Sequence, residues 1–248
     1  MRRVIGVIAI LALLLGIWEV YVDAGGADPL FLPAPHSIAK ALVDDRSLLW
    51  SNFLVTAEEV LLGILLAAVV GLAVSIAIHF SHALRDAVYP LVVASQTVPI
   101  PMLAPVLVFW LGFGLRDKLV IVALVSFFSI VVATLDGLRA VDPDMVKLMR
   151  TFDASRRRIF MHVELPAALP AVFTGAKIAV PVAVIGAYLA ELAGSNAGLG
   201  YIFQQANAQL LEPRAYAAVF IQAVFAITLF VLLTGVERVV LPWHRNPE

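Results

Sequence analysis

Long apolar runs alternate with short polar segments along almost the whole chain. Several of the uncharged runs reach about 18 residues, the length that crosses the hydrocarbon core of a bilayer as a helix. The pattern therefore predicts an all-α, polytopic membrane protein with a single integral domain over residues 1–248. About six transmembrane helices are expected, over residues 4–22, 53–78, 87–112, 119–138, 171–192 and 216–240.

The longest polar interruption in the second half of the chain lies between the fourth and fifth of these spans, at residues 139–170. Its basic residues are Arg139, Lys147, Arg150, Arg156, Arg157 and Arg158. Lysine and arginine concentrate in cytoplasmic loops, so this loop is expected in the cytoplasm. Leu148, Phe152 and Phe160 recur at helical spacing, and residues 153–155 are typical of a break between two short helices. Apolar residues on a basic helical loop favour docking onto another protein.

The third predicted span carries no charge but contains Pro90, Pro99, Pro101 and Pro105. Proline removes a backbone donor and clashes with the preceding turn, and the freed groups must be satisfied by protein or by a water-filled cavity. Two interpretations stay open. The span is either a kinked helix whose polar side chains bond to neighbours, or a bent segment that lines a pathway. In the second case the residues expected near the pathway are Ser95, Gln96, Thr97 and Pro99.

Among the ionisable residues in the predicted spans, Glu191 is the most informative. It closes the fifth span, which Pro181 is expected to kink, and it precedes a glycine-containing loop at residues 194–200. A carboxylate at membrane depth is costly and often functional. We therefore expect Glu191 to be partly buried, hydrogen-bonded and close to the pathway at an outer gate. The alternative is an interfacial glutamate in contact with water.

Other residues of the spans have simpler interpretations. Glu58 and Glu59 are interpreted as an interfacial pair, and Lys177 as a side chain that reaches toward the membrane surface. Gly63 and Gly71 supply small faces for close helix packing, which dominates helix association in membranes.

Composition narrows the class of protein. The chain is 62% hydrophobic and 14% charged, with a mean hydropathy of +0.96, whereas soluble domains average about 25% charged residues. The net charge of −1 gives no general attraction to nucleic acid, and the absence of cysteine excludes disulfides. With the N-terminus inside, most of the 17 lysine and arginine residues fall on one side, so both termini are expected in the cytoplasm. The basic start also fits a signal peptide, but Trp18 and Tyr21 favour a retained first span.

Chemical motifs are missing from the sequence. No G-x-x-x-x-G-K-[ST] loop for nucleotide phosphates and no hydrolytic signature occurs. His79 and His82 could share a helix face but have no third ligand nearby, so a metal site is not expected. Transport is favoured over catalysis, and an ion-coupled secondary transporter and an integral membrane enzyme remain as alternatives.

The loop at residues 139–170 resembles the cytoplasmic signature of the permease subunits of bacterial ABC importers, and we call it the coupling loop. That signature begins with E-A-A, continues with a glycine, and ends with I-x-L-P. Here Lys147-Leu148-Met149 occupy the first slots, Asp153 the glycine slot, and Val163-Glu164-Leu165-Pro166 the end. Lys147 reverses a charge, and Asp153 replaces a residue that tolerates positive φ. Asp153 can still cap the second short helix.

The resemblance covers about residues 32–243. The matching elements outside the loop are Leu32-Pro33-Ala34-Pro35, Val98-Pro99, Ala104-Pro105, Phe109 to Gly114, Ala190-Glu191 and Gly198-Leu199-Gly200-Tyr201. They are similar to the branch that handles nitrate, taurine, alkanesulfonates and vitamin precursors. Within it, residues 95–99 and 241–244 look most like permeases for pyrimidine precursors of thiamine or for riboflavin.

This resemblance implies a type I ABC importer permease fold in the bacterial cytoplasmic membrane, surrounded by lipid. Two copies of the chain would enclose one pathway, and an extracytoplasmic solute-binding protein would deliver the solute. A separate ATP-binding subunit would hold ATP and Mg, so the chain itself needs no cofactor and is not expected to be an enzyme. The residues implied in ATPase coupling are Lys147, Arg150, Phe152, Asp153, Ala154, Ser155, Arg156, Arg157, Phe160, Leu165 and Pro166.

Overall fold

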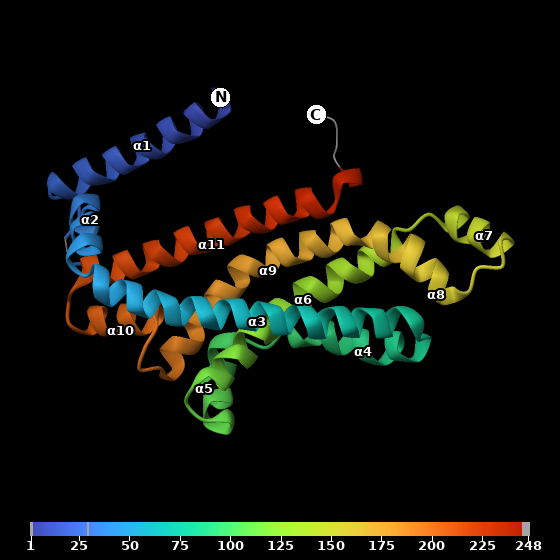
Figure 1. Ribbon diagram of the computed structural model, residues 1–248. Helices are drawn as coiled ribbons and strands as arrows, with labels where there is room; N and C mark the ends of the chain where they lie inside the picture. Colours follow the sequence, from blue (N-terminus) through green and yellow to red (C-terminus); the bar gives the residue numbers. More distant parts are fainter. Residues whose placement is uncertain (1, 29, 245–248) are drawn as a thin grey trace. The chain divides into compact units, whose positions relative to one another are not determined.

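The computed structural model describes residues 2–28 and 30–244, without the side chains of residues 2–5, 7, 8 and 244. Within these residues every regular element is helical and no strand occurs, so the all-α prediction is confirmed (Figure 1). The elements are α1 (Arg2–Asp23), α2 (Pro35–Asp44), α3 (Arg46–Phe80), α4 (His82–Ser95), α5 (Ile100–Leu111), α6 (Leu115–Arg139), α7 (Pro143–Thr151), α8 (Arg156–Ile159), the π turn η1 (Phe160–Glu164), α9 (Leu165–Gly194), α10 (Leu199–Ala208), α11 (Glu212–Val240) and the 3-10 turn η2 (Pro242–His244).

Four helical stretches of the described chain are long and apolar enough to cross a membrane: α3, α6, α11 and the continuous segment from α8 through α9. Helices α4 and α5 form a bent pair that makes a fifth span if they are counted together. The expected first span, 4–22, falls within α1, whose first side chains lie outside the described residues. The basic residues near the two chain ends, Arg2, Arg3 and Arg245, lie outside the described side chains as well.

The third expected span, 87–112, is not one helix. Helix α4 ends at Ser95, α5 begins at Ile100, and the two helices meet at an angle of 103°. Pro99 is the N-cap of α5 and Pro101 follows within its first turn, where proline is tolerated. The α-helical conformation is disfavoured for a residue that precedes proline, and two prolines follow Val98 within three residues, which explains why the helix is interrupted here.

The described chain divides into two compact units. The first, here the N-terminal unit, comprises residues 1–57 and 195–224, and the second, the central unit, comprises residues 58–194 and 225–248. Helices α3 and α11 each contribute residues to both units. In the N-terminal unit the apolar core consists of Ile38, Leu49, Leu199, Ile202, Ala217 and Ala218. Asp45 accepts two hydrogen bonds of 2.7 Å from the guanidinium of Arg214, which ties α11 to the start of α3.

The central unit is built on close contacts of the second half of α3, α6 and α9. Helices α6 and α9 run side by side (Figure 1). Glycines make these contacts possible: a Cβ at Gly71 would lie 3.1 Å from Ile130, and one at Gly175 would lie 2.8 Å from the carbonyl oxygen of Ser129. The expected use of Gly63 and Gly71 for close packing is therefore confirmed, and Gly63 faces Val122 in the same way.

Candidate functional site

The coupling loop begins with an exposed amphipathic helix. The carboxylate of Asp142 caps α7 by accepting the N–H of Asp144 at 2.8 Å, and Pro143 opens the first turn. No residue of α7 is buried. Met145 and Leu148 on α7 and the following Phe152 are all at least half exposed, and Phe152 reaches 72%. Their spacing of three and four residues places them on one side of the helix, so α7 presents an apolar stripe.

The turn after α7 shows how Asp153 replaces glycine. Asp153 adopts a left-handed conformation with φ of 52°, which asparagine and aspartate tolerate better than other residues. The N–H of Ala154 bonds to the carbonyl of Met149 at 3.1 Å and closes the turn. The expected break between two short helices is confirmed. The cap of α8 is Ser155, which accepts the N–H of Arg158 at 3.4 Å, so the expectation that Asp153 caps this helix is wrong.

The residues predicted to form one basic and apolar docking face do not all face solvent. Phe152, Arg156 and Arg157 are exposed. Phe160 is only 6% exposed and packs on the ring of Phe80, with 5.0 Å between ring centroids. Its expected place in a docking face is therefore corrected, because its side chain is used within the chain.

The coupling loop also joins α9 earlier than expected. The fifth span, expected over 171–192, begins as a helix at Leu165, and Pro166 and Pro170 both lie inside it. Pro166 lies just after the π turn of residues 160–164, where its missing N–H interrupts the α-helical hydrogen-bond ladder. The loop and the span consequently form one continuous helical segment from Arg156 to Gly194.

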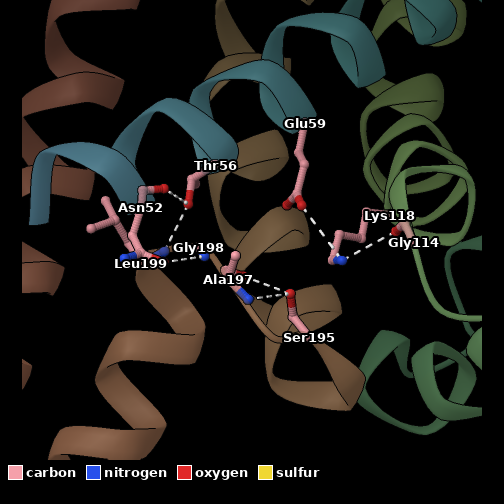
Figure 2. Close-up of polar contacts among 9 residues, drawn as sticks. All are labelled: Asn52, Thr56, Glu59, Gly114, Lys118, Ser195, Ala197, Gly198 and Leu199. Carbon is pink, nitrogen blue, oxygen red and sulfur yellow. Dashed lines mark hydrogen bonds and ion pairs between the residues drawn. The ribbon is translucent and has the colours of Figure 1, made fainter. Parts of the chain in front are cut away.

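A buried charged cluster joins the three packed helices of the central unit. Glu59 on α3, Lys118 on α6 and Glu191 on α9 are all at most 6% exposed. The ammonium of Lys118 lies 3.6 Å from Oε1 of Glu59 and donates to the carbonyl of Gly114 at 3.1 Å (Figure 2). The carboxyl groups of Glu59 and Glu191 lie within side-chain hydrogen-bonding reach of each other. Such groups stabilise a membrane helix bundle only when they are paired.

This cluster corrects one expectation and confirms another. Glu59 is not an interfacial residue in water, whereas its neighbour Glu58 is exposed. The predicted burial of Glu191 is confirmed, and its position on the pathway stays a prediction. Lys118, which directly precedes the span expected over residues 119–138, was not among the predicted functional residues. The available signal was the recurrence of opposite charges, Glu59 and Lys118, near the ends of two long apolar runs.

A second ion pair of the central unit was also missed. Lys177 on α9 donates to Glu237 on α11 at 2.8 Å, and both side chains are less than 20% exposed. The expectation that Lys177 extends to the membrane surface is therefore wrong. Ionisable side chains in membrane helices usually pair inside the bundle, and the sequence alone does not show that α11 provides the carboxylate.

At the break between α4 and α5, the polar side chains bond to their own turn. The hydroxyl of Ser95 donates to the carbonyl of Val92 at 2.7 Å, and that of Thr97 to Ala94 at 2.8 Å. Gln96 and Thr97 are exposed. Ser95 and Thr97 agree with the first interpretation, in which polar side chains bond to neighbours, and the segment is bent as the second one requires. Whether these residues line a pathway stays a prediction.

In the N-terminal unit, α3 caps α10. Oδ1 of Asn52 accepts the N–H of Gly198, and the hydroxyl oxygen of Thr56 accepts the N–H of Leu199, both at 2.8 Å (Figure 2). The N-cap Gly198 has φ of 107° and no side chain of its own to cap the helix. Because Asn52 and Thr56 are four residues apart on one face of α3, they satisfy two adjacent donors that the helix leaves unpaired.

The fold defines a class of protein: a polytopic membrane protein with a broken span and an exposed helical loop. Residues 60–246 match the family described as "Binding-protein-dependent transport system inner membrane component". This is about three quarters of the chain, and the chain belongs to that family.

Curated relatives agree with this assignment. The chain is 36% identical over 235 residues to the formylaminopyrimidine transport permease protein ThiX of Halalkalibacterium halodurans, covering 94% of each chain. It is 30% identical to the riboflavin transport system permease protein RibX of Chloroflexus aurantiacus, over 98% of this chain and 91% of the relative. It is 28% identical to the taurine transport system permease protein TauC of Escherichia coli, with the same coverage.

A solved structure has the same fold. The chain is similar to one from an inward-facing form of the MetNI methionine ABC transporter, with a TM-score of 0.65 and 19% identity, over 81% of this chain and 98% of the other. The chain is thus a permease subunit of an ABC importer for a small solute, and the fold is of the type I importer class. Family membership supports this function over the secondary transporter and the membrane enzyme.

Proposed function

We propose that this chain forms the translocation pathway for a pyrimidine precursor of thiamine, such as a formylaminopyrimidine. The observation that carries the proposal is the 36% identity to the formylaminopyrimidine permease across 94% of both chains. Riboflavin is the second candidate because of the similarity to the riboflavin permease over almost the entire chain. Taurine, alkanesulfonates and nitrate follow, the first two through lower identities to their permeases.

The coupling loop is the part that an ATP-binding subunit would contact. Its apolar stripe of Met145, Leu148 and Phe152 is exposed beside Arg156 and Arg157. Apolar anchors next to arginines are typical of the centres of protein interfaces. ATP and Mg would be held by that partner, and its closure would move the loop. Because the loop continues into α9, its movement would reach the far end of that helix, where Glu191 lies.

The remaining parts of the transporter follow from the same assignment. A second copy of the chain would complete the pathway, and Phe109, Trp110 and Phe113, each more than 75% exposed, offer an apolar surface for it. A solute-binding protein would deliver the solute from the other side of the membrane. The basic coupling loop and both termini would face the cytoplasm.

Uptake by the reconstituted transporter tests the substrate. The chain would be assembled in liposomes with its ATP-binding subunit, with the binding protein outside and ATP and Mg inside. We expect ATP-dependent uptake of labelled formylaminopyrimidine, competed by hydroxymethylpyrimidine and not by taurine. Liposomes with ADP provide the control. Uptake of riboflavin or taurine instead of the pyrimidine would replace the substrate, and uptake driven by an ion gradient without ATP would contradict the importer function.

A further inference from the structure

The second half of the coupling loop, at residues 156–164, presents three side chains to the end of α3. The guanidinium of Arg156 lies 5.1 Å from the ring centroid of Phe80. The ring of Phe160 lies 5.0 Å from that of Phe80, measured between centroids. Oε2 of Glu164 lies 2.9 Å from Nε2 of His79. The three residues are spaced four apart, and the two residues that they meet are the last two of α3.

A regular α-helix would not keep these three side chains in line. It turns about 100° per residue, so residues four apart drift by about 40° at each step. From Phe160 to Glu164 the chain is a π turn, closed by a bond from the N–H of Leu165 to the carbonyl of Phe160. A π turn has more residues per turn than an α-helix, so the side chains of Phe160 and Glu164 stay closer to the same side of the segment. Pro166 explains the position of the π turn, because proline crowds the preceding turn and interrupts the α-helical ladder.

The pair of His79 and Glu164 is shielded from solvent. The side chains are 14% and 17% exposed, respectively. The ring of His79 lies edge-on to Phe80 and 5.8 Å from Phe160, measured between centroids. The rings around the pair exclude water, and a hydrogen bond in such low-dielectric surroundings is stronger than one in water. This contact therefore resists rotation of the segment about its own axis.

We propose that His79 and Glu164 are positioning residues which, with the π turn, set the rotational orientation of the coupling loop relative to α3. A movement of the loop then reaches α3 and α9 together and is not absorbed by twisting at residues 160–164. This positioning role goes beyond the proposed docking of an ATP-binding subunit. Only one measurement, transport per ATP hydrolysed by the assembled transporter, depends on that docking.

Spin-label distances test the orientation in the full chain alone. The chain has no native cysteine, so labels can be placed at L148C on α7 and L84C on α4, both exposed sites. In lipid nanodiscs we expect a narrow distance distribution for this background. H79A and E164A should each broaden it to a similar extent, and the double variant should broaden it no further, because the two changes remove one shared contact. The exchanged pair H79E/E164H should narrow it again.

Two matched controls accompany these variants. H82A removes an exposed histidine three residues beyond His79 and should leave the distribution unchanged. M161A should also leave it unchanged, whereas deletion of Met161 removes one residue from the π turn. The deletion should shift the mean distance, because the loop turns by about 100° relative to α9. Wild-type distributions in H79A, E164A and the deletion, or strictly additive broadening in the double variant, would overturn the proposal.

The functional readout is made on the assembled transporter. E164A should retain the ATP-binding subunit but lower transport per ATP hydrolysed by roughly fivefold, the lower end of typical coupling between two sites, and the exchanged pair should recover part of it. Unchanged transport per ATP in E164A would overturn the positioning role. If the wild-type chain fails to bind the ATP-binding subunit at all, the proposed function fails, while the distance measurements still decide the orientation.

Discussion

The ammonium group of Lys118 lies 3.6 Å from a carboxylate oxygen of Glu59, and both side chains are almost fully buried between α3 and α6. Removal of one partner leaves the other charge buried and uncompensated, which is far more costly than the loss of both. We expect Lys118→Met to lower the free energy of unfolding by about 3 kcal/mol, and Glu59→Gln/Lys118→Met to lower it by less. Thermal unfolding in nanodiscs, followed by tryptophan fluorescence, measures both.

Glu58→Gln is the matched control for this pair, because Glu58 is the exposed neighbour of Glu59. Its effect should stay within about 0.5 kcal/mol, as for most surface substitutions. Wild-type stability of Lys118→Met would show that the ion pair does not hold α3 to α6.

Glu191 is fully buried next to Glu59 at the end of α9. We expect Glu191→Ala to lower uptake by the reconstituted transporter while assembly with the ATP-binding subunit persists, because the coupling loop lies at the other end of α9. Glu191→Gln distinguishes the role of the charge from that of the hydrogen bonds. If the hydrogen bonds matter, this variant should transport nearly as well as the wild type; if the charge matters, it should lose transport as Glu191→Ala does. Asn196→Ala, an exposed position in the following loop, serves as the control. Full transport by Glu191→Ala would remove Glu191 from the working parts of the permease.

Asn52 holds the first turn of α10 through the N–H of Gly198. Asn52→Ala leaves that donor unpaired at a buried site, which we expect to lower the free energy of unfolding by about 1 to 2 kcal/mol. Hydrogen exchange at Gly198 and Leu199 should accelerate before the rest of α10. Ser51→Ala, one residue earlier and exposed, should leave exchange unchanged, and equal protection in Asn52→Ala would disprove the capping role.

The exposed arginines of the coupling loop are expected to bind the ATP-binding subunit. Arg156→Glu/Arg157→Glu reverses two charges and should abolish co-purification of that subunit without unfolding the permease. The chain should still elute as a single species of wild-type size. Arg46→Glu, an exposed reversal at the start of α3, should keep the partner bound. Wild-type co-purification by the double variant would contradict the assignment of this surface.

Gln96 and Thr97 lie exposed at the break between α4 and α5. Cysteine at either position should react with a small water-soluble thiol reagent, and the rate should change when ATP is added to the assembled transporter. Val92→Cys, buried in the central unit, should remain unlabelled. Failure of both positions to react in every nucleotide state would exclude them from the pathway.

Much of the architecture follows from local properties of the sequence. Apolar runs of membrane length predict helical spans, because backbone N–H and C=O groups in lipid must bond to each other and a helix satisfies all of them within one segment. The helix breaks at Pro99 and at Asp153 were predictable from local sequence. Proline restricts the backbone around it, and aspartate tolerates the left-handed conformation better than most residues do. The class of transporter was predictable as well, since the coupling loop and the segment at residues 198–201 resemble motifs of one family.

The partners of the charged residues depended on the tertiary structure. Glu59 meets Lys118, His79 meets Glu164, and Lys177 meets Glu237, each across at least 59 residues of sequence. The sequence determined that these groups lie in or near the membrane, where each needs a partner. The packing of the helices and their rotation about their own axes decide which partner each group meets. A single π turn between Phe160 and Glu164 changes that rotation. Such pairings arise from contacts distant in sequence, and hydrophobic periodicity carries no information about them.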